Sequence, residues 1–437
     1  MSGIAEILKN WNFNVTGSDS TSSNATNKLK ENGIKVTIGH DFENIKKADL
    51  VVYTAAISKD DPSLLEASKL NIPCVERADF LGELTKSYEN TIGVSGTHGK
   101  TTTTSMVSCC FLEANLDPSI QVGATLKEID GNYRVGNSPY FIIEACEYVE
   151  SFLKFRPKSE IILNIDNDHL DYFKNLENIK QAFIKYVKLL PNDGLLVLNA
   201  DDKNTLDLKE FVNCKTVTYG ISNNTADFIA KNIVFDDNGF ASFDTYFKNT
   251  FLTNIKLSVA GAHNVLNALA CIALCYNYGI SIDSIKSALS KFTGASRRLE
   301  YKGSFNNISI YDDYGHHPTE ILATNKAIQN KKYNESWVVF QPHTYSRTKN
   351  LLDDFANSLL NFDHVIITDI YAARENNIYN ISSNDLANKI KSLGKDNVIY
   401  ISDFNEIANY LKQNCKERDL ILTLGAGTVT NISSLLL

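Results

Sequence analysis

The 437-residue sequence predicts an α/β fold in three domains, each with a mostly parallel sheet covered by helices. Short apolar stretches alternate with helical stretches along the chain, which is the pattern of β-α-β units. A glycine-rich loop separates one apolar stretch from a helix near residue 96. Because domains commonly hold about 100–200 residues, we place the three domains at residues 1–88, 89–297 and 298–437.

The first domain is expected to begin with a helix and then to alternate strands with helices. The expected elements are a helix over Ile4–Leu8, a strand over Phe13–Thr16, a polar helix over Asn27–Asn32, and strands over Ile34–Ile38 and Leu50–Tyr53, the last of them buried. This spacing predicts a parallel, Rossmann-like sheet. Such domains normally open with a strand and a glycine-rich turn, so we interpret the first strand as missing here.

The second and third domains show the same alternation. In the second, we expect a helix over Lys100–Ala114 and strands at Thr91–Ser95, Tyr140–Glu144, Glu160–Ile165 and Leu195–Asn199. In the third, we expect strands at Trp337–Phe340, His364–Thr368, Val398–Ile401 and Leu420–Leu424. The second domain is then an α/β unit around the glycine-rich loop, and the third is again Rossmann-like.

The composition excludes several classes of protein. Hydrophobic residues make up 43% and charged residues 22% of the chain, as in soluble globular proteins. A net charge of −8 argues against a protein that binds nucleic acid through its overall charge. The eight cysteines form no C-x-x-C pair, so we expect reduced thiols. Neither an apolar stretch of about 18 residues nor a secretory pattern occurs, so we expect a cytoplasmic protein without membrane insertion.

The most specific motif follows the strand at Thr91–Ser95 and reads Gly96-Thr97-His98-Gly99-Lys100-Thr101-Thr102. Strand, loop and helix come in the order that a phosphate loop requires. Glycines let the backbone N–H groups point at phosphate oxygens, and the helix N-terminus adds a favourable dipole. We expect Lys100 to reach the β- and γ-phosphates and Thr101 to bind Mg²⁺. Val94 replaces the first glycine of the strict pattern, so the alternative is a loop that only caps a helix.

Acidic residues and a histidine follow the next two expected strands. Glu144 ends one strand, and the other runs into Asn164-Ile165-Asp166-Asn167-Asp168-His169. Ligands of open α/β sheets gather at the carboxyl ends of strands, so both groups are expected beside the phosphate loop. Glu144 is a candidate metal ligand and His169 a candidate functional residue. The alternatives are a solvated loop charge for Glu144 and a hydrogen-bonded structural role for His169.

Together these motifs resemble those of the Mur ligases, and in particular those of the members that add L-alanine. The matching segments are Gly96–Thr102, Glu144–Leu153, Asn164–Asp171, Ala260–Ala268, Arg297–Glu300, Asp312–Glu320, Phe340–Thr348 and Tyr371–Glu375. They occur in the family's order and span most of the chain. Three departures exist. Cys146 stands where many members carry Asp. Only Met1–Ala5 remains of the family's opening glycine-rich turn, which we expect to reflect a late start, and Gly425–Val429 lacks an expected Asp.

The resemblance implies that the first domain holds UDP-N-acetylmuramate, the central domain ATP, and the third domain L-alanine, with Mg²⁺ or Mn²⁺ as cofactor. The implied ATP-binding residues are Gly96, Thr97, His98, Gly99, Lys100, Thr101, Thr102, His263, Asn264, Asn267, Arg298 and Asp313. The implied metal ligands are Thr101 and Glu144 for one ion and His169 for a second, and the implied substrate residues are Tyr314, His316, His343 and Arg347. Lys100, His169 and Arg298 are the implied catalytic residues, in a monomer or homodimer.

The implied reaction is a ligation through an acyl phosphate. The lactyl carboxylate of the sugar attacks the γ-phosphorus of ATP, and the amine of L-alanine then displaces phosphate. Three alternatives stay open at this point: a recycling ligase that adds a ready-made tripeptide, a nucleotide-binding or UDP-sugar-binding protein without activity, and a P-loop GTPase. Tyr314-Gly315 before His316-His317 favours the alanine-adding type, and no Asn-Lys-x-Asp guanine motif occurs.

Overall fold

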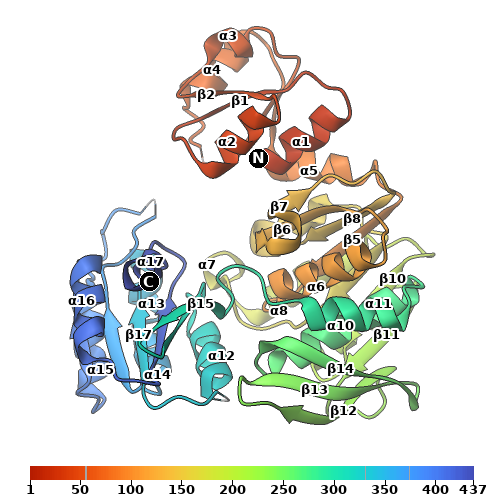
Figure 1. The fold of residues 1–437 in the computed structure, drawn as a ribbon. Helices are drawn as coiled ribbons and strands as arrows, with labels where there is room; N and C mark the ends of the chain where they lie inside the picture. Colours follow the sequence, from red (N-terminus) through yellow and green to blue (C-terminus); the bar gives the residue numbers. More distant parts are fainter. Residues whose placement is uncertain (55–56, 330, 374) are drawn as a thin grey trace. The chain divides into compact units, whose positions relative to one another are not determined.

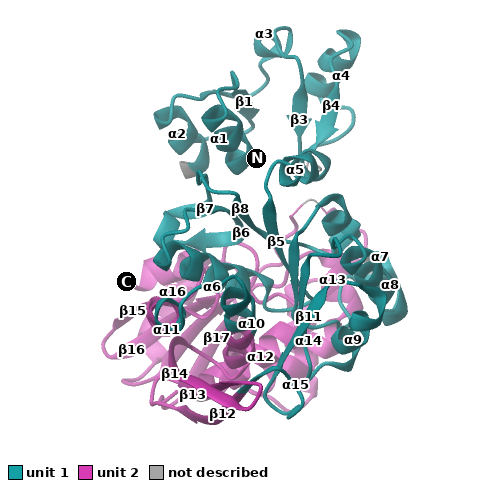
Figure 2. Cartoon of the chain, turned by 90° about the vertical axis from the view of Figure 1, so that its right-hand side faces the viewer, with its two compact units in different colours: residues 1–229, 270–285 teal, residues 230–269, 286–437 magenta. Residues whose placement is uncertain are grey.

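The computed structural model describes residues 1–54, 57–329, 331–373 and 375–437. Its helices and strands alternate through most of the chain (Figure 1). They group into two compact units, one of residues 1–229 and 270–285 and the other of residues 230–269 and 286–437 (Figure 2). Among the described residues, no helix is both long enough and apolar enough to cross a lipid bilayer.

The first part of unit 1 contains two short parallel sheets. Its elements are α1 (Ser2–Asn10), β1 (Thr16–Asp19), α2 (Asn24–Glu31), β2 (Lys35–Ile38), α3 (Phe42–Ile45), β3 (Val51–Tyr53), α4 (Pro62–Lys69), β4 (Cys74–Glu76) and α5 (Arg77–Thr85). Strand β1 pairs with β2 and strand β3 with β4, both in parallel. The parallel pairing is as expected. The prediction of a single sheet is wrong, because no described strand joins the two pairs.

Two expected strands of this part differ from the structure. The strand expected over Phe13–Thr16 is wrong, because residues 12 and 13 terminate α1: Asn12 has a φ of 65°, its N–H donates to Lys9, and the N–H of Phe13 donates to Leu8. These two bonds form a Schellman C-cap. Strand β3 is only half-buried, contrary to expectation, because it has a single strand neighbour.

The central sheet of unit 1 surrounds strand β5. The elements here are β5 (Asn90–Ser95), α6 (Lys100–Glu113), β6 (Ser119–Leu126), η1 (Lys127–Ile129), β7 (Gly131–Arg134), β8 (Tyr140–Glu144), η2 (Tyr148–Lys154), β9 (Ser159–Ile162), α7 (Leu170–Phe173), α8 (Leu176–Val187), β10 (Leu195–Asn199), α9 (Lys203–Leu206), η3 (Asp207–Phe211), β11 (Lys215–Gly220) and β12 (Phe228–Phe235). These strands belong to a ten-stranded sheet, in the order β12-β11-β10-β9-β5-β8-β6-β7, and β12 passes from unit 1 into unit 2 at residue 230. Strand β5 is parallel to both β8 and β9, so the expected flanking of the loop by these strands is confirmed.

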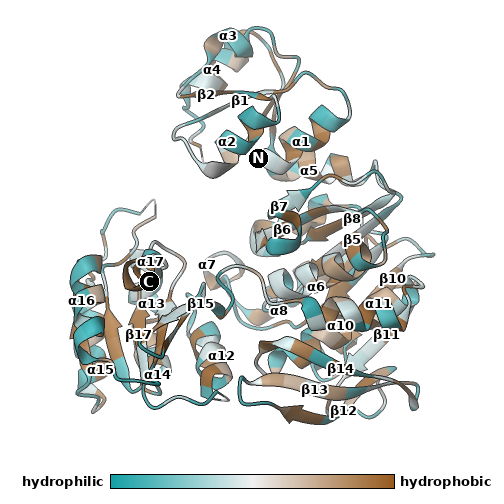
Figure 3. Ribbon diagram, viewed as in Figure 1, coloured by the Kyte–Doolittle hydropathy of each residue, from teal (hydrophilic) through white to brown (hydrophobic). Residues whose placement is uncertain are grey.

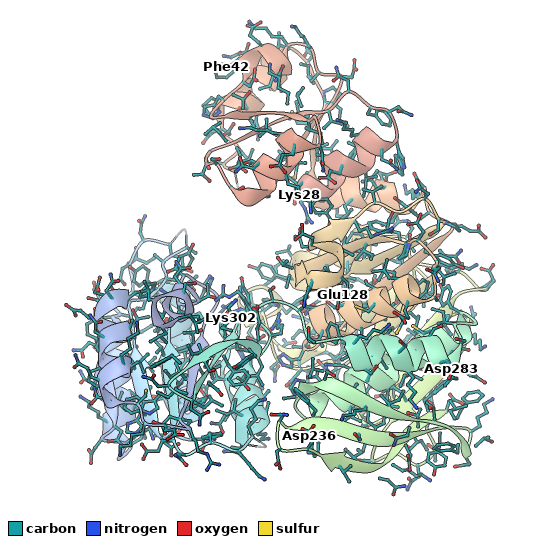
Figure 4. All side chains as sticks on the ribbon, in the orientation of Figure 1. Lys28, Phe42, Glu128, Asp236, Asp283 and Lys302 are labelled. Atoms are coloured by element: carbon teal, nitrogen blue, oxygen red, sulfur yellow. The ribbon has the colours of Figure 1, made fainter. Side chains whose placement is uncertain are left out.

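Most strands of this sheet agree with the sequence analysis. The strands expected at Tyr140–Glu144 and Leu195–Asn199 are confirmed to the residue, whereas β9 ends at Ile162, before the expected Ile165. Strands β9 and β10 are buried along their whole length, as expected for parallel strands covered on both faces. In the first part of the unit, Lys28 on α2 donates to the Asp130 carbonyl just before β7, at 2.7 Å (Figure 4).

Helices α6 and α10 (His263–Asn277) contact each other through sulfur atoms. The Sγ of Cys110 lies 3.6 Å from that of Cys271, which lies 3.9 Å from that of Cys275. Burial raises the pKa of the Cys271 and Cys275 thiols well above its ordinary value, so they pack as neutral groups. All eight cysteines are free, as expected.

Unit 2 contains an antiparallel extension and a second parallel sheet. Its further elements are β13 (Phe240–Phe247), β14 (Thr250–Ala260), α11 (Ile282–Lys291, which crosses from unit 1), β15 (Glu300–Phe305), β16 (Ile308–Asp313), α12 (Pro318–Gln329), β17 (Ser336–Phe340), α13 (Tyr345–Asn350), α14 (Leu352–Leu359), β18 (His364–Ile367), α15 (Ser383–Ser392), β19 (Val398–Tyr400), α16 (Phe404–Asn414), β20 (Leu420–Leu424) and α17 (Asn431–Leu436). Strands β13 and β14 pair in antiparallel fashion.

The second parallel sheet has the strand order β15-β16-β20-β17-β18-β19, in which only β15 runs antiparallel. Its four expected strands are present, three of them with ends shifted by one residue. Apolar clusters cover both faces of the sheet, and strand β17 is strongly hydrophobic (Figure 3). Because these strands are parallel, the carboxyl ends of β16, β17 and β20 lie at one edge, where Asp313 ends β16 and Gln341 and Gly425 follow β17 and β20.

Candidate active site

The glycine-rich loop connects β5 to α6 in a conformation that requires glycine at two positions. Gly96 has a φ of 136° and Gly99, the N-cap of α6, a φ of 87°. A Cβ added to Gly96 would lie about 3.0 Å from the Leu163 Cβ and 3.1 Å from the Asn164 nitrogen. Of the other expected phosphate residues, Thr97 and His98 lie in the loop, and Lys100, Thr101 and Thr102 form the first turn of α6.

Asn164 holds the loop against the end of β9. Its Oδ1 accepts from the His98 N–H at 2.7 Å, and its Nδ2 donates to the His98 carbonyl at 3.0 Å. Its own carbonyl accepts from the Thr97 N–H at 2.9 Å. Sequence reasoning assigned no role to Asn164, although an amide that follows a strand beside a phosphate loop is a signal for such a brace.

The Lys100 ammonium is fully engaged with protein acceptors. Its Nζ donates to the carbonyls of Gly96 at 2.6 Å and Thr97 at 3.0 Å, and to Oε1 of Glu147 at 3.1 Å. The second oxygen of Glu147, Oε2, lies 2.9 Å from Nζ in an ion-pair contact outside hydrogen-bond geometry. Burial would lower the pKa of Lys100, but the Glu147 carboxylate opposes this, and the pKa is raised above its usual value.

Thr101 and Glu144 come together as expected for ligands of one ion. The Thr101 Oγ1 donates to Oε1 of Glu144 at 2.9 Å, and Oε2 of Glu144 accepts from the Gly123 N–H at 2.6 Å. Thr101 lies in the first turn of α6 and Glu144 ends β8, so the parallel pairing of β5 and β8 brings them together. A hydroxyl and a carboxylate are hard oxygen donors, which fit Mg²⁺ or Mn²⁺.

His169 lies in a second group, with Glu147 and Asp168. Its Nε2 is 3.7 Å from Oε1 of Glu147 and 3.8 Å from Oδ2 of Asp168. One ligand atom of each residue lies within 4.8 Å of the others. The backbone of His169 is left-handed, with φ 51° and ψ 38°, and its ring packs on Tyr148 at 4.5 Å between centroids. Two carboxylates and an imidazole also fit a divalent cation, and Glu147 is a member that sequence reasoning did not assign.

The residues expected at the adenine end of ATP lie at the start of α10, in unit 2. Asn264 donates to the Ala260 carbonyl at 2.7 Å, and Asn267 donates to Oδ1 of Asn264 at 2.9 Å. Burial, with a further contribution from Arg298, lowers the pKa of His263 to about 4. His263 is therefore a neutral imidazole near pH 7, which suits contact with an uncharged base or ribose.

Arg298, Asp313 and Tyr314 lie close together in unit 2. The Arg298 guanidinium is 5.7 Å from the Tyr314 ring centroid. The two Asp313 oxygens accept from the Leu299 N–H at 2.7 Å and the Gly315 N–H at 2.8 Å. Burial raises the pKa of Asp313 to about 6, against the opposing charge of Arg298.

The neighbouring Arg297 joins the Arg297–Glu300 segment to the glycine-containing segment Gly425–Val429. Its guanidinium donates to Asp312 at 3.0 Å and to the carbonyls of Gly425 at 2.5 Å and Gly427 at 3.1 Å. Sequence reasoning assigned no role to Gly425–Val429 or to Arg297.

The four expected substrate residues lie near one another at the carboxyl edge of the second sheet. The His316 ring is 5.5 Å from that of Tyr314 and 5.6 Å from that of His343. Within the described residues, the buried Nδ1 of His343 and Nη1 of Arg347 have no hydrogen-bond partner. Burial, followed by His316 and Arg347, lowers the pKa of His343 to about 4. Such unpaired donors suit an anionic or polar ligand.

One expected segment is only partly described. Tyr371 lies beside His343, with 5.7 Å between ring centroids, and Glu375 accepts from the Ser346 N–H at 2.8 Å. Arg374, which belongs to the same segment, lies outside the described residues.

Comparison with known proteins identifies the family of this chain. Three family models match the chain: "Mur ligase family, catalytic domain" at residues 1–89, "Mur ligase middle domain" at 94–275, and "Mur ligase, glutamate ligase domain" at 297–427. The chain belongs to the Mur ligase family. The three-domain α/β fold follows for this Mur ligase, while the domain limits given above stay a prediction.

Curated relatives and solved structures resemble this Mur ligase along its length. A UDP-N-acetylmuramate–L-alanine ligase of Acetivibrio thermocellus is 52% identical, covering 100% of the chain and 93% of the relative. One of Clostridium botulinum strain Loch Maree is 50% identical over 100% of the chain and 94% of the relative. The UDP-N-acetylmuramate–alanine ligase structure from Thermotoga maritima has a TM-score of 0.84 at 28% identity, covering 100% and 95% of the two chains.

A structure of another activity is also similar to this Mur ligase. A murein peptide ligase from Psychrobacter arcticus has a TM-score of 0.72 at 25% identity, covering 100% of this chain and 95% of that one. Both solved structures share the fold, so the choice between the two activities depends on the curated relatives and on side chains.

The raised pKa of Asp313 predicts a pH dependence of stability. Between pH 3.8 and about 6 the folded protein keeps a proton on Asp313 that the unfolded chain has lost, so this group destabilises the fold as the pH rises through that window. We expect Asp313→Asn to weaken this fall in stability, measured as the Tm between pH 4 and 7. The exposed Asp354→Asn on α14 is the control. An unchanged pH profile in Asp313→Asn would contradict the prediction.

Proposed function

We propose that this Mur ligase joins L-alanine to the lactyl carboxylate of UDP-N-acetylmuramate with ATP as the energy source, in the synthesis of peptidoglycan precursors. The observation that carries the proposal is the 52% identity, over the whole chain, to a relative named UDP-N-acetylmuramate–L-alanine ligase. The phosphate loop, with its buried lysine and the Thr101–Glu144 contact, supports an ATP-dependent reaction.

In the proposed reaction a carboxylate, which is a poor acyl donor, is activated by phosphorylation. A lactyl oxygen attacks the γ-phosphorus of ATP, so a P–O bond forms and the bond to ADP breaks. The alanine nitrogen then attacks the carbonyl carbon of the acyl phosphate, loses a proton, and phosphate leaves. Such phosphoryl transfer depends on positioning and on neutralising charge.

Each assigned side chain has a task in this scheme. The loop N–H groups and Lys100 hold phosphate oxygens, and Arg298 contacts the γ-phosphate. His263, Asn264, Asn267 and Asp313 hold the nucleoside part of ATP. Tyr314, His316, His343 and Arg347 bind the sugar acid and L-alanine. With a pKa of about 4, His343 is neutral near pH 7 and can accept a hydrogen bond from the amine.

Thr101 with Glu144, and His169 with its acidic neighbours, are the proposed ligands of Mg²⁺ or Mn²⁺. When bound, the ions neutralise charge on the phosphates. The residues fit these ions because both groups offer hard oxygen donors, and the second adds an imidazole. We also propose that the protein works in the cytoplasm, without nucleic acid and without insertion into a membrane, as a monomer or homodimer.

The alternative of a tripeptide-adding ligase has less support. The similar alanine ligase structure has the higher TM-score, 0.84 against 0.72 for the murein peptide ligase. The curated relatives at 52% and 50% identity carry the name of the alanine-adding enzyme. Tyr314-Gly315 before the histidine pair points in the same direction.

The decisive experiment measures phosphate release from ATP with UDP-N-acetylmuramate and either L-alanine, a tripeptide or neither. Release that requires L-alanine is the expected outcome. Release that requires the tripeptide would assign the protein to the recycling type, and no release with either would refute the proposed activity. Glycine and L-serine in place of L-alanine then test the amino-acid preference.

Lys100→Ala is expected to abolish ligation, because the loop loses its charge toward the phosphates, and to lower the Tm, because the buried Glu147 carboxylate loses its counter-charge. The measurement is phosphate release, with circular dichroism as the check on folding. Lys203→Ala, which removes an exposed lysine at the start of α9, is the matched control and should keep full activity. Normal turnover of Lys100→Ala would refute the placement of the phosphate loop.

His343→Ala is expected to weaken the amino-acid half of the reaction more than ATP binding. We expect the KM for L-alanine to rise by about tenfold or more, equivalent to roughly 1.4 kcal/mol, while the Kd of ATP stays within about twofold. His364→Ala is the control. His364 is the first residue of β18, so it lies at the amino end of that strand, away from the carboxyl ends that carry the pocket. An equal loss of alanine use and ATP binding would argue against the assigned pocket.

A further inference from the structure

The hydrogen-bonding capacity of the Lys100 ammonium is used up inside the protein. An ammonium has three N–H donors, and Nζ has the Gly96 carbonyl, the Thr97 carbonyl and Glu147 as partners. A phosphate oxygen can gain a bond from Lys100 only if one of these partners is given up. The two carbonyls belong to the loop itself, whereas Glu147 comes from a separate strand end, so Glu147 is the partner that can be exchanged.

Glu147 cannot lose its cation without a replacement. Its side chain is only 2% exposed, and both of its oxygens lie within 3.1 Å of the Lys100 Nζ. A buried carboxylate that loses its counter-charge is strongly disfavoured. Movement of Lys100 toward a phosphate therefore needs a second positive charge to arrive beside Glu147.

The neighbours of Glu147 are suited to hold that second charge. Its Oε1 lies 3.7 Å from the Nε2 of His169, and the same nitrogen lies 3.8 Å from Asp168. The side chains of both neighbours are 20% exposed, so the group is partly reachable from solvent. Carboxylate and imidazole donors within 4.8 Å of one another can bind one divalent cation.

We propose that Glu147 is a positioning residue that holds Lys100 away from the phosphates when the loop is empty, and that it exchanges Lys100 for a divalent cation shared with Asp168 and His169. Lys100 and the cation compete for the same carboxylate. Nucleotide, by drawing Lys100 away, makes room for the cation, and the cation releases Lys100 for the nucleotide. Binding of the two is then cooperative, and by linkage the effect is reciprocal. The proposal rests on the assignment of the loop to ATP made above.

The test measures Mn²⁺ binding to the full-length protein without nucleotide, by electron paramagnetic resonance of the free ion. Glu147→Gln removes a ligand and should weaken Mn²⁺ binding by about tenfold or more. Lys100→Met removes the competing ammonium and should strengthen Mn²⁺ binding, by several-fold. If Glu147 and Lys100 only supported the fold, the two substitutions would not change the Mn²⁺ affinity in opposite directions. Glu150→Gln is the matched control, since Glu150 lies in the same segment and pairs with Lys185 at 2.8 Å.

A second measurement is ATP binding by calorimetry with a chelator present. Glu147→Gln should bind metal-free ATP more tightly than the wild type, because its Lys100 is already free. The proposal would be overturned if Lys100→Met bound Mn²⁺ no better than the wild type does. This result would be decisive even if Glu147→Gln failed to fold. Wild type that binds Mn²⁺ but no ATP under any condition would instead refute the proposed function, and the Mn²⁺ series would still decide the exchange.

Discussion

The parallel pairing of β5 with β8 on one side and β9 on the other is the constraint on which the phosphate site depends. Side chains that are far apart in the sequence meet only because three strands end at one edge of the sheet. Glu144 follows β8, Asn164 follows β9, and the glycine-rich loop follows β5 between them. The interior strands β5, β8 and β9 are almost wholly buried, so this edge is held by the core and not by the loops themselves.

Charge distribution around the loop follows from this arrangement. Glu144, Glu147 and Asp168 lie at this edge together with Lys100. The carboxylates give the edge an excess of negative charge beside the phosphate loop. Such a surplus is unfavourable for an anion unless cations accompany it. The arrangement therefore fits the proposed binding of ATP together with divalent cations, and it gives the loop lysine a carboxylate partner in Glu147.

Much of this organisation could be predicted from the sequence, because strand patterns and strand-end acids are local features. The pairing of Thr101 with Glu144 followed from two strand ends and one loop motif. Asn164, Glu147 and Arg297 could not be assigned in the same way, because their roles depend on which backbone or side chain they reach across the fold. The error at Phe13–Thr16 has a local cause: Phe13, three residues after the end of α1, is part of the helix cap, where the pattern suggested a strand. The two separate sheets of the first part depend on long-range pairing that no local pattern reports.

The left-handed backbone of His169 has a consequence for how this protein can change over time. An imidazole-bearing residue at φ 51° carries a conformational cost of about 1 kcal/mol that glycine or asparagine avoids. Selection for thermal stability alone would favour replacing His169 by glycine or asparagine. The replacement would remove the imidazole ring that lies beside two carboxylates. Stability of the fold and the proposed role of His169 thus favour different residues at this position.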